Sequence, residues 1–153
     1  MTHDKQNQPL DASPIHLLHR AGQCASELFA DEMLDDDLTP RQYAVLVTVA
    51  SHEGLSQTAL VDRTGIDRST LADVVRRMLK KGLLHRRRTK EDARAYAVKL
   101  TDEGRDRLSA AGPVASMVDN RILSVLEPGQ RERFLADLRL IVEALSQANP
   151  HKS

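Results

Sequence analysis

The sequence has 153 residues, enough for one domain with its own core and too few for two. Hydrophobic residues make up 41% and charged residues 29%, which excludes wholesale disorder, and the single cysteine excludes an internal disulfide. The formal net charge is zero and aromatic residues make up only 3%, which argues against a protein that stacks the bases of single-stranded nucleic acid.

The first two predicted helices both begin with a capping signal. Ser13–Pro14 places an N-cap residue before a proline at the first helical position, and apolar residues then recur at spacings of three and four to about Leu34. Thr39–Gln42 is a capping box, and the helix that it opens stops at Gly54. We interpret the acidic run over 31–37, between the two helices, as a solvated helix end.

The next two predicted helices are joined by a glycine turn. Ser56 caps a short helix over 57–64, and Gly65 can turn the chain with a positive φ. Asp67 caps a second helix whose apolar residues fall on one face as far as Gly82. This order, with a strongly basic second helix, is typical of a helix-turn-helix.

Beyond this pair the sequence predicts a β-hairpin and then a long helix. Two short runs, 83–88 and 95–100, are joined by the polar residues 89–94, which is typical of a hairpin, or wing. Thr101 caps the long helix, which we expect to be kinked or interrupted at Gly112–Pro113.

The last predicted helix begins at Glu127–Pro128. It carries an apolar stripe suited to packing on other helices, formed by Phe134, Leu138, Ile141 and Leu145. The predicted fold is mainly α with a small β-wing, in one domain over 13–146, and we expect frayed tails over 1–12 and 147–153.

Charge is separated along the chain. Residues 62–94 hold eleven lysines or arginines against five acids, a net charge of +6, so the rest of the chain carries −6. Eight basic residues and no acid lie between Arg76 and Lys90. Such a density attracts a polyanion such as DNA by releasing its counterions, although a solvated basic face with no partner remains an alternative.

Four short motifs occur along the chain in the same order as these elements. They are Leu38-Thr39-Pro40-Arg41-Gln42-Tyr43, Asp67-Arg68-Ser69-Thr70-Leu71, Lys81-Gly82-Leu83-Leu84, and a wing signature made of Asp92, Arg94, Leu100, Thr101 and Gly104. Over about residues 13–146 the chain resembles the MarR family of bacterial transcription regulators. The proline often found near the wing tip of that family is missing, with 89–91 in its place.

The resemblance implies an obligate homodimer and a DNA partner. Dimerisation helices over about 13–36 and 101–146 would flank a winged helix-turn-helix over about 39–100, and each recognition helix would enter a major groove of a pseudo-palindromic operator. The resemblance implies a protein without a cofactor and without enzymatic activity. The chain has neither a phosphate-binding glycine loop nor a nucleophile motif. We expect a cytoplasmic protein, because no apolar run is long enough to span a bilayer and the first eight residues have no apolar core.

Candidate DNA contacts lie on the recognition helix and the wing. On the helix they are Arg68, Ser69, Thr70 and Asp73 near base edges, with Arg76 and Arg77 near phosphate or guanine. On the wing they are Arg86, Arg88 and Lys90 near phosphate, with Arg94 in a minor groove as the family places it. The alternation of a strand places Arg87 on the opposite face from Arg86 and Arg88. Three alternatives stay open. Asp67 and Ser69 only cap the helix, or Asp92 only orients Arg94, or Arg68 makes an internal salt bridge, since the rotation of about 100° per residue directs it towards the buried side.

A candidate effector site lies on the first helix. His16, His19 and Arg20 share one face, which borders a cavity for small effectors in this family, and Tyr43 adds a hydroxyl. The cluster suits an anion, and we expect an aromatic carboxylate or an acyl-CoA thioester. Hydrogen bonding of both histidines across the dimer interface is equally open, and metal binding would need ligands that the sequence does not identify.

Cys24 raises a redox alternative, because one branch of the family senses peroxide with a cysteine at the start of the first helix. Cys24 falls about nine residues later, beside small residues, and we favour a buried structural thiol. A non-specific architectural DNA-binding protein is the other competing function, since it needs basic charge but no sensory cavity.

Overall fold

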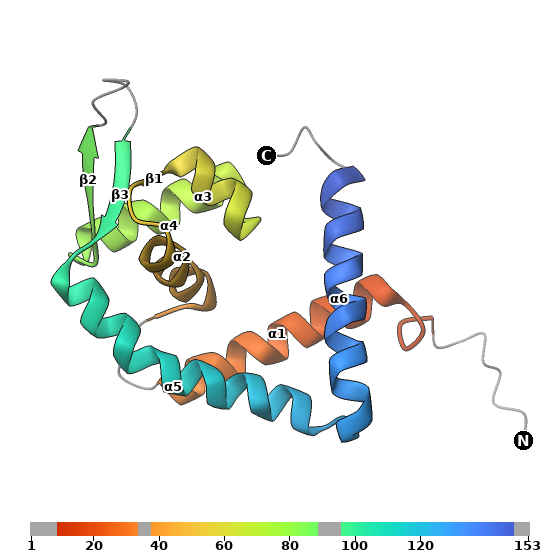
Figure 1. Ribbon diagram of the computed structural model, residues 1–153. Helices are drawn as coiled ribbons and strands as arrows, with labels where there is room; N and C mark the ends of the chain where they lie inside the picture. The colour runs from red at the N-terminus through yellow and green to blue at the C-terminus, as the bar shows by residue number, and fades with distance from the viewer. Residues whose placement is uncertain (1–8, 34–37, 89–95, 149–153) are drawn as a thin grey trace, which may run out of the picture.

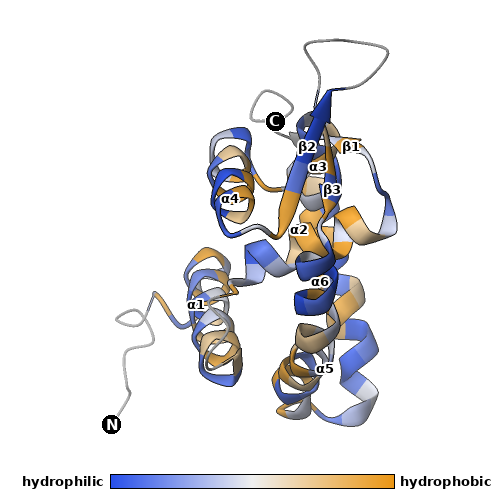
Figure 2. Ribbon diagram, turned by 90° about the vertical axis from the view of Figure 1, so that its left-hand side faces the viewer, coloured by the Kyte–Doolittle hydropathy of each residue, from blue (hydrophilic) through white to orange (hydrophobic). Residues whose placement is uncertain are grey.

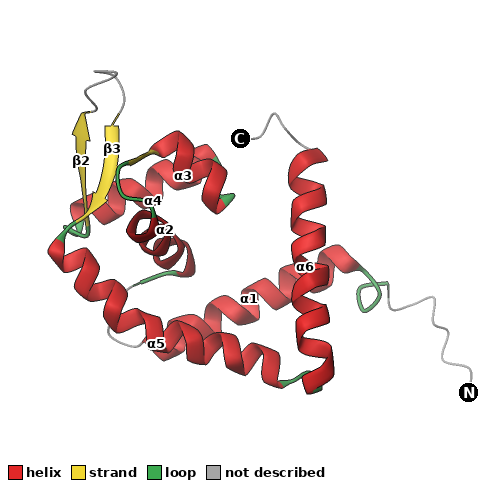
Figure 3. Cartoon of the chain, viewed as in Figure 1, coloured by secondary structure: helices red, strands yellow, loops and turns green. Residues whose placement is uncertain are grey.

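The computed structural model describes residues 9–33, 38–88 and 96–148 and is mainly helical, with one small sheet (Figure 1, Figure 3). In chain order the elements are α1 (Pro14–Met33), α2 (Pro40–Ser51), β1 (Leu55–Ser56), α3 (Gln57–Thr64), α4 (Arg68–Lys80), β2 (Leu84–Arg88), β3 (Tyr96–Leu100), α5 (Asp102–Ser124) and α6 (Pro128–Ala148). The predicted fold class, a winged helix-turn-helix between terminal helices, is confirmed. Residues 1–8 and 149–153 of the predicted tails, residues 34–37 of the acidic run, and the wing tip with Lys90, Asp92 and Arg94 lie outside the described residues. Residues 147 and 148, which we expected in the frayed C-terminal tail, belong to α6.

Side-chain caps set where the helices begin. The Thr39 hydroxyl accepts from the amide of Gln42 at 3.1 Å, and the Gln42 side chain accepts from the Thr39 amide at 3.2 Å, which completes the predicted capping box. Ser56, Asp67 and Thr101 each accept from the amide three residues further on. Such a cap satisfies an amide that has no partner within the helix, and a serine or threonine cap is typically worth about 1 kcal/mol.

Glycines in the left-handed region end the helices of the helix-turn-helix. Gly65 has a φ of 71° at the end of α3, and Gly82 has a φ of 75° just beyond α4. A side chain would be strained in this conformation, so both turns depend on glycine.

The sheet has the order β1-β3-β2 and is antiparallel throughout. Its hairpin lies within one residue of the predicted boundaries at the described ends. Strand β1, which pairs Leu55 with Val98, was not predicted. Two residues are too few to carry a strand period, so only the pairing with β3 reveals β1.

A tight elbow joins the sheet to α5. The Thr101 hydroxyl donates to the carbonyl of Gly82 at 2.6 Å, and the Thr101 amide donates to the carbonyl of Leu83 at 3.1 Å. The buried Gly104 lies directly against the Leu83 carbonyl. These contacts give a physical reason for the Leu-Thr-x-x-Gly motif, which fixes where α5 leaves the wing.

The core lies inside the winged helix and continues between α1 and α5. Leu46, Leu60, Leu71, Met78 and Val98 are fully buried there. α1 and α5 lie side by side below them, packed through a second group of buried residues that comprises Phe29, Met33, Ala111, Ala115 and Val118 (Figure 1). Burial of each large apolar side chain is worth about 1.5–3 kcal/mol.

Helix α6 projects from the end of α5 and stands apart from the winged helix (Figure 1). None of its described residues is buried, and the apolar side chains of Leu140, Val142 and Leu145 are more than half exposed. Helix α5 runs through Pro113 as one continuous helix, so of the predicted kink or interruption the interruption is wrong. None of the helices in the described residues has the length and apolar character needed to cross a membrane.

Most of α1 is exposed as well. Of its predicted apolar stripe, Ile15 and Leu18 are exposed and only Phe29 is buried. Cys24 is also exposed, so the predicted burial of its thiol is wrong for the single chain. The reason is that α1 packs on the core near its C-terminal end, and Cys24 lies before that contact.

Candidate nucleic-acid interface and effector cavity

Helix α4 has one buried face and one basic face. Leu71, Val74, Val75 and Met78 are buried, at the spacing that the sequence indicated. Among the candidate DNA contacts Ser69, Arg76 and Arg77 are exposed, and Thr70 and Asp73 are half-buried. Arg68 is also exposed rather than directed to the buried side. All of the candidate DNA contacts on α4 are therefore at least partly accessible to solvent.

Asp67 organises the N-terminus of α4. Its carboxylate accepts from the Thr70 amide at 2.9 Å, the Thr70 hydroxyl at 2.7 Å and the Ser69 hydroxyl at 3.0 Å. The Thr70 amide is the main cause that holds the pKa of Asp67 below its usual range, with the two hydroxyls adding to it. Because both hydroxyls donate their one hydrogen bond to Asp67, they can only accept hydrogen bonds from an outside partner.

Asp73 binds two arginines on the exposed side of α4. One carboxylate oxygen accepts from Arg76, and the other accepts from Arg77 Nε at 3.0 Å. The hydrogen bond from Arg76, followed by the charge of Arg77, lowers the pKa of Asp73. The middle of the helix therefore presents two guanidinium groups held side by side.

The wing places its arginines on two faces. Pairing of Arg88 with Tyr96, and of Arg86 with Val98, puts Arg86 and Arg88 on one face of the hairpin, while Arg87, paired with Ala97, lies on the other. This is the alternation that the sequence predicts. Figure 2 shows β2 changing from hydrophobic at its start to hydrophilic towards the wing tip.

Tyr96 was not among the predicted site residues. The guanidinium carbons of Arg86 and Arg88 lie 5.7 Å and 5.9 Å from the centroid of its ring. These distances are within the range of a cation–π interaction. An aromatic residue opposite two arginines of a predicted hairpin was the available signal, but using it requires the register of the strands.

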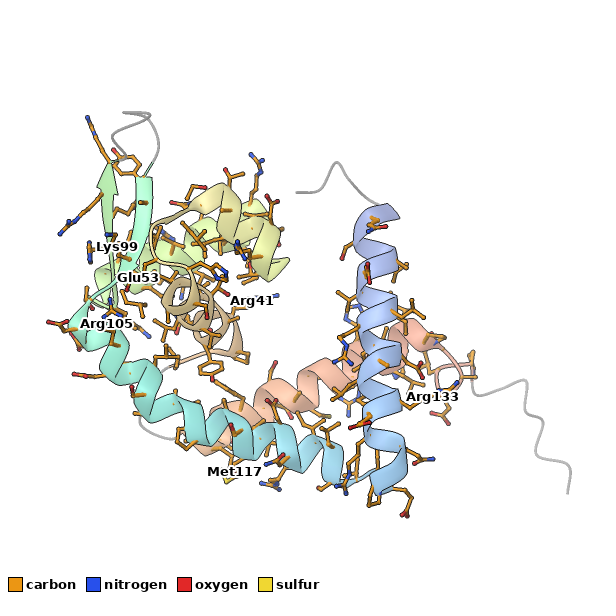
Figure 4. All side chains as sticks on the ribbon, viewed as in Figure 1. Arg41, Glu53, Lys99, Arg105, Met117 and Arg133 are labelled. Atoms are coloured by element: carbon orange, nitrogen blue, oxygen red, sulfur yellow. The ribbon has the colours of Figure 1, made fainter. Side chains whose placement is uncertain are left out.

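An ion pair braces the base of the wing. Glu53, in the turn between α2 and β1, pairs with Arg105 near the start of α5. Figure 4 shows Lys99 of β3 close to this pair, so three elements converge there. A second ion pair, between Arg121 of α5 and Glu32 of α1, has an N–O distance of 2.9 Å. Partly exposed pairs of this kind contribute about 1 kcal/mol or less.

Two cavities lie beside the junction of α1 and α2. The smaller, of about 210 Å³, is mostly apolar and is lined by Ala25, Ser26, Phe29, Pro40, Tyr43, Ala115, Val118, Asp119 and Ile122. The larger one, of about 760 Å³, extends from Pro40 and Arg41 to Thr70, Asp73 and Arg77 on α4. Tyr43 therefore lies where α1, α2 and α5 meet.

The structure does not bring the other predicted effector residues to Tyr43. His16 is half-buried, His19 and Arg20 are exposed, and the Arg20 guanidinium donates to the Gln23 side chain at 2.9 Å. Neither of the two cavities is lined by these three residues. Arg20 precedes Ala25 by five residues, about 8 Å along the helix axis. Within the described residues, no group of three or more acidic, histidine or cysteine side chains could hold a metal ion.

These features define a winged helix-turn-helix protein with a basic recognition helix, and comparison with known proteins gives its family. The profile of the MarR family matches residues 36–95. The transcriptional regulator HosA of Escherichia coli is 36% identical over 108 residues, which cover 71% of this chain and 80% of HosA. The chain belongs to the MarR family and is a DNA-binding transcription regulator.

Solved structures agree with this assignment. The fold is similar to that of BpsR from Bordetella bronchiseptica, described with regulation of its DNA binding by 6-hydroxynicotinic acid, with a TM-score of 0.80 and 29% identity over 84% of this chain and 92% of BpsR. It is also similar to the transcriptional repressor CouR bound to a 23-mer DNA duplex, with a TM-score of 0.80 and 28% identity over 90% of this chain and 97% of CouR.

Proposed function

We propose that this protein is a sequence-specific repressor that binds a pseudo-palindromic operator as a homodimer and is released by a small anionic effector. The observation that carries the proposal is the exposed face of α4. Its N-terminus is capped by Asp67, and Arg76 and Arg77 further along both pair with Asp73. The likeness to CouR, a repressor bound to DNA, supports repression. A regulator of this kind works in the cytoplasm, where its DNA is.

The dimer would use α1 and α6. In the single chain α6 has no buried residue, yet one side of it carries Leu138, Ile141 and Leu145. A large exposed apolar surface of this kind marks an association site. A second copy that covers α1 and α6 would leave the two winged helices free to reach two half-sites about one helical turn of DNA apart.

The DNA contacts divide by chemistry. Because their hydroxyls donate hydrogen bonds to Asp67, Ser69 and Thr70 offer acceptors to the DNA, which suits the exocyclic amino groups of adenine and cytosine. Arg76 and Arg77 offer donors to guanine or phosphate, and Arg68 lies beside them at the start of α4. On the wing we assign Arg86, Arg88 and Lys90 to phosphates and Arg94 to the minor groove.

The effector would enter the cavity at Tyr43. Its apolar lining suits an aromatic ring, and BpsR supports an aromatic acid as the class of ligand. His16, His19 and Arg20 lie before this cavity along α1 and do not line it in the single chain. We propose them as the cationic groups for a part of the ligand outside the cavity, either the carboxylate or the phosphates of an acyl-CoA thioester. Hydrogen bonding of the histidines across the dimer remains the competing role.

Calorimetric titration of aromatic acids and their thioesters into the wild-type dimer, beside a DNA-release assay, tests this site. We expect Arg20→Ala and His19→Ala to weaken both binding and release. Tyr43→Phe removes only the hydroxyl and keeps the ring, whose centroid lies 6.0 Å from that of the Phe29 ring. The variant therefore separates hydrogen bonding from packing. A ligand that releases the wild type and all three variants equally would contradict the pocket assignment.

The exposure of Cys24 favours one second candidate, a redox-sensing regulator, because a sensor thiol must be accessible to its oxidant. The test is DNA binding before and after treatment with hydrogen peroxide. Release of the wild type but not of Cys24→Ser would support redox sensing, and equal behaviour of the two proteins would exclude it.

A further inference from the structure

The ring of Tyr96 contacts two cations of the adjacent strand. Tyr96 pairs directly with Arg88, and Arg86 lies one diagonal step away, opposite Val98. Both guanidinium carbons lie over the ring, at 5.7 Å and 5.9 Å from its centroid. We call these three side chains the wing cluster.

The wing cluster lies on the sheet face that packs on the helices. Nearer the base of the wing, the same face carries the pair Leu84 and Leu100, both buried in the core with α4, followed by the buried Val98. Beyond Val98 this face emerges from the core, since Arg86, Arg88 and Tyr96 are all exposed. The cluster therefore continues the side of the sheet on which the recognition helix packs.

The ring offsets the costs of holding two arginines there. Neighbouring guanidinium groups repel each other, and each long side chain loses conformational freedom when it is fixed for binding. The negative face of an aromatic ring attracts a guanidinium and still leaves its N–H donors directed outward. Arginines that are already ordered lose less freedom when a polyanion arrives.

We propose that Tyr96 is a positioning residue of the DNA interface, whose ring holds Arg86 and Arg88 in place for phosphates of the DNA backbone. The inference rests on the proposed function and deepens it, because it names the side chain that positions two of the proposed phosphate contacts. Arg87, on the other face of the same strand, lies outside the cluster and provides a matched control.

The first test compares Tyr96→Leu with Tyr96→Phe in binding to the operator by fluorescence anisotropy over a series of salt concentrations. We expect Tyr96→Leu to bind about three- to tenfold more weakly. The slope of log K against log salt should become shallower by about one to two units, because phosphate contacts are lost. Tyr96→Phe keeps the ring and should match the wild type in both. Wild-type behaviour of Tyr96→Leu, or loss of binding in Tyr96→Phe, overturns the proposal.

A double-mutant cycle separates positioning from folding. In an Arg86→Ala, Arg88→Ala background, Tyr96→Leu should cause no further loss of affinity, because the side chains that it positions are gone. In an Arg87→Ala background, Tyr96→Leu should cost as much as it does in the wild type. Additive losses in the first background overturn the proposal, including the case in which Tyr96→Leu simply destabilises the protein.

NMR of the DNA-free dimer distinguishes failure of this inference from failure of the proposed function. The Nε–Hε resonances of Arg86 and Arg88 should move on Tyr96→Leu, which removes the ring current, and stay in place on Tyr96→Phe. Unchanged resonances in Tyr96→Leu overturn the ring contact. If the wild type binds no duplex at all, but the Arg86 and Arg88 resonances move on Tyr96→Leu as expected, the DNA function is refuted and with it the phosphate role, while the ring contact stands.

Discussion

Gly104 and Leu83 are in such close contact that a Cβ atom on Gly104 would overlap the carbonyl oxygen of Leu83 and lie 3.1 Å from its carbonyl carbon. The same carbonyl accepts from the amide of Thr101. This contact holds the first turn of α5 against the chain that enters the wing, so it fixes how α5 leaves the winged helix.

Gly104→Ala should therefore destabilise the protein by about 1–3 kcal/mol, because backbone must shift to admit the methyl group. Gly112→Ala, in the middle of the same helix with no atom within 4 Å of its Cβ position, is the control and should be neutral or stabilising by up to about 1 kcal/mol. Urea unfolding of the three proteins at one protein concentration measures both effects. Equal stability of wild type and Gly104→Ala would disprove the close contact.

The exposed stripe of α6 predicts a concentration-dependent fold. Light scattering at micromolar protein should give the mass of two chains, and the midpoint of thermal unfolding should rise with protein concentration. Ile141→Glu places a charge within the stripe and should yield monomers. Arg139→Glu, on the opposite side of α6, should leave the dimer intact. A monomeric wild type would contradict this account of α6.

Asp67 predicts how stability depends on acidity. Its pKa is lowered in the folded protein, first by the Thr70 amide, so its stabilisation is complete above the unfolded value near pH 4 and is lost as the pH falls through the folded pKa. Asn also caps helices well but does not titrate here. The difference in free energy of unfolding between the wild type and Asp67→Asn should shift in favour of Asn on acidification below about pH 4. A constant difference would rule out the cap as its source.

Arg94 is assigned to the DNA interface from the Asp-x-Arg motif alone, because it lies outside the described residues. Arg94→Ala should weaken operator binding and reduce the slope of log K against log salt by at most about one unit. The thermal midpoint should not change. Unchanged affinity would remove Arg94 from the interface.

Local signals account for what the sequence predicted well. Thr39, Ser56, Asp67 and Thr101 mark helix starts through bonds to amides three residues away, so a short stretch of sequence contains all the information needed. The rotation of about 100° per residue likewise gave the faces of α4. Arg68 departs from this pattern because it is the first residue of the helix, before the buried turns begin.

Features that depend on distant parts of the chain were not predictable in the same way. The contact of Tyr96 with Arg86 and Arg88 depends on strand register, which the composition of 83–100 leaves open. The separation of Arg20 from Tyr43 depends on where α2 meets α1, and spacing along α1 alone does not indicate this.

The central claim is sequence-specific operator binding, and the most direct measurement is the affinity of the full-length protein for DNA flanking its own gene. Titration beside a scrambled duplex of equal length and composition, at physiological salt, gives the ratio of the two dissociation constants. The account predicts a preference of at least about a thousandfold for one segment of the flanking DNA. A preference of about tenfold or less for every segment would contradict it and favour a non-specific architectural DNA-binding protein.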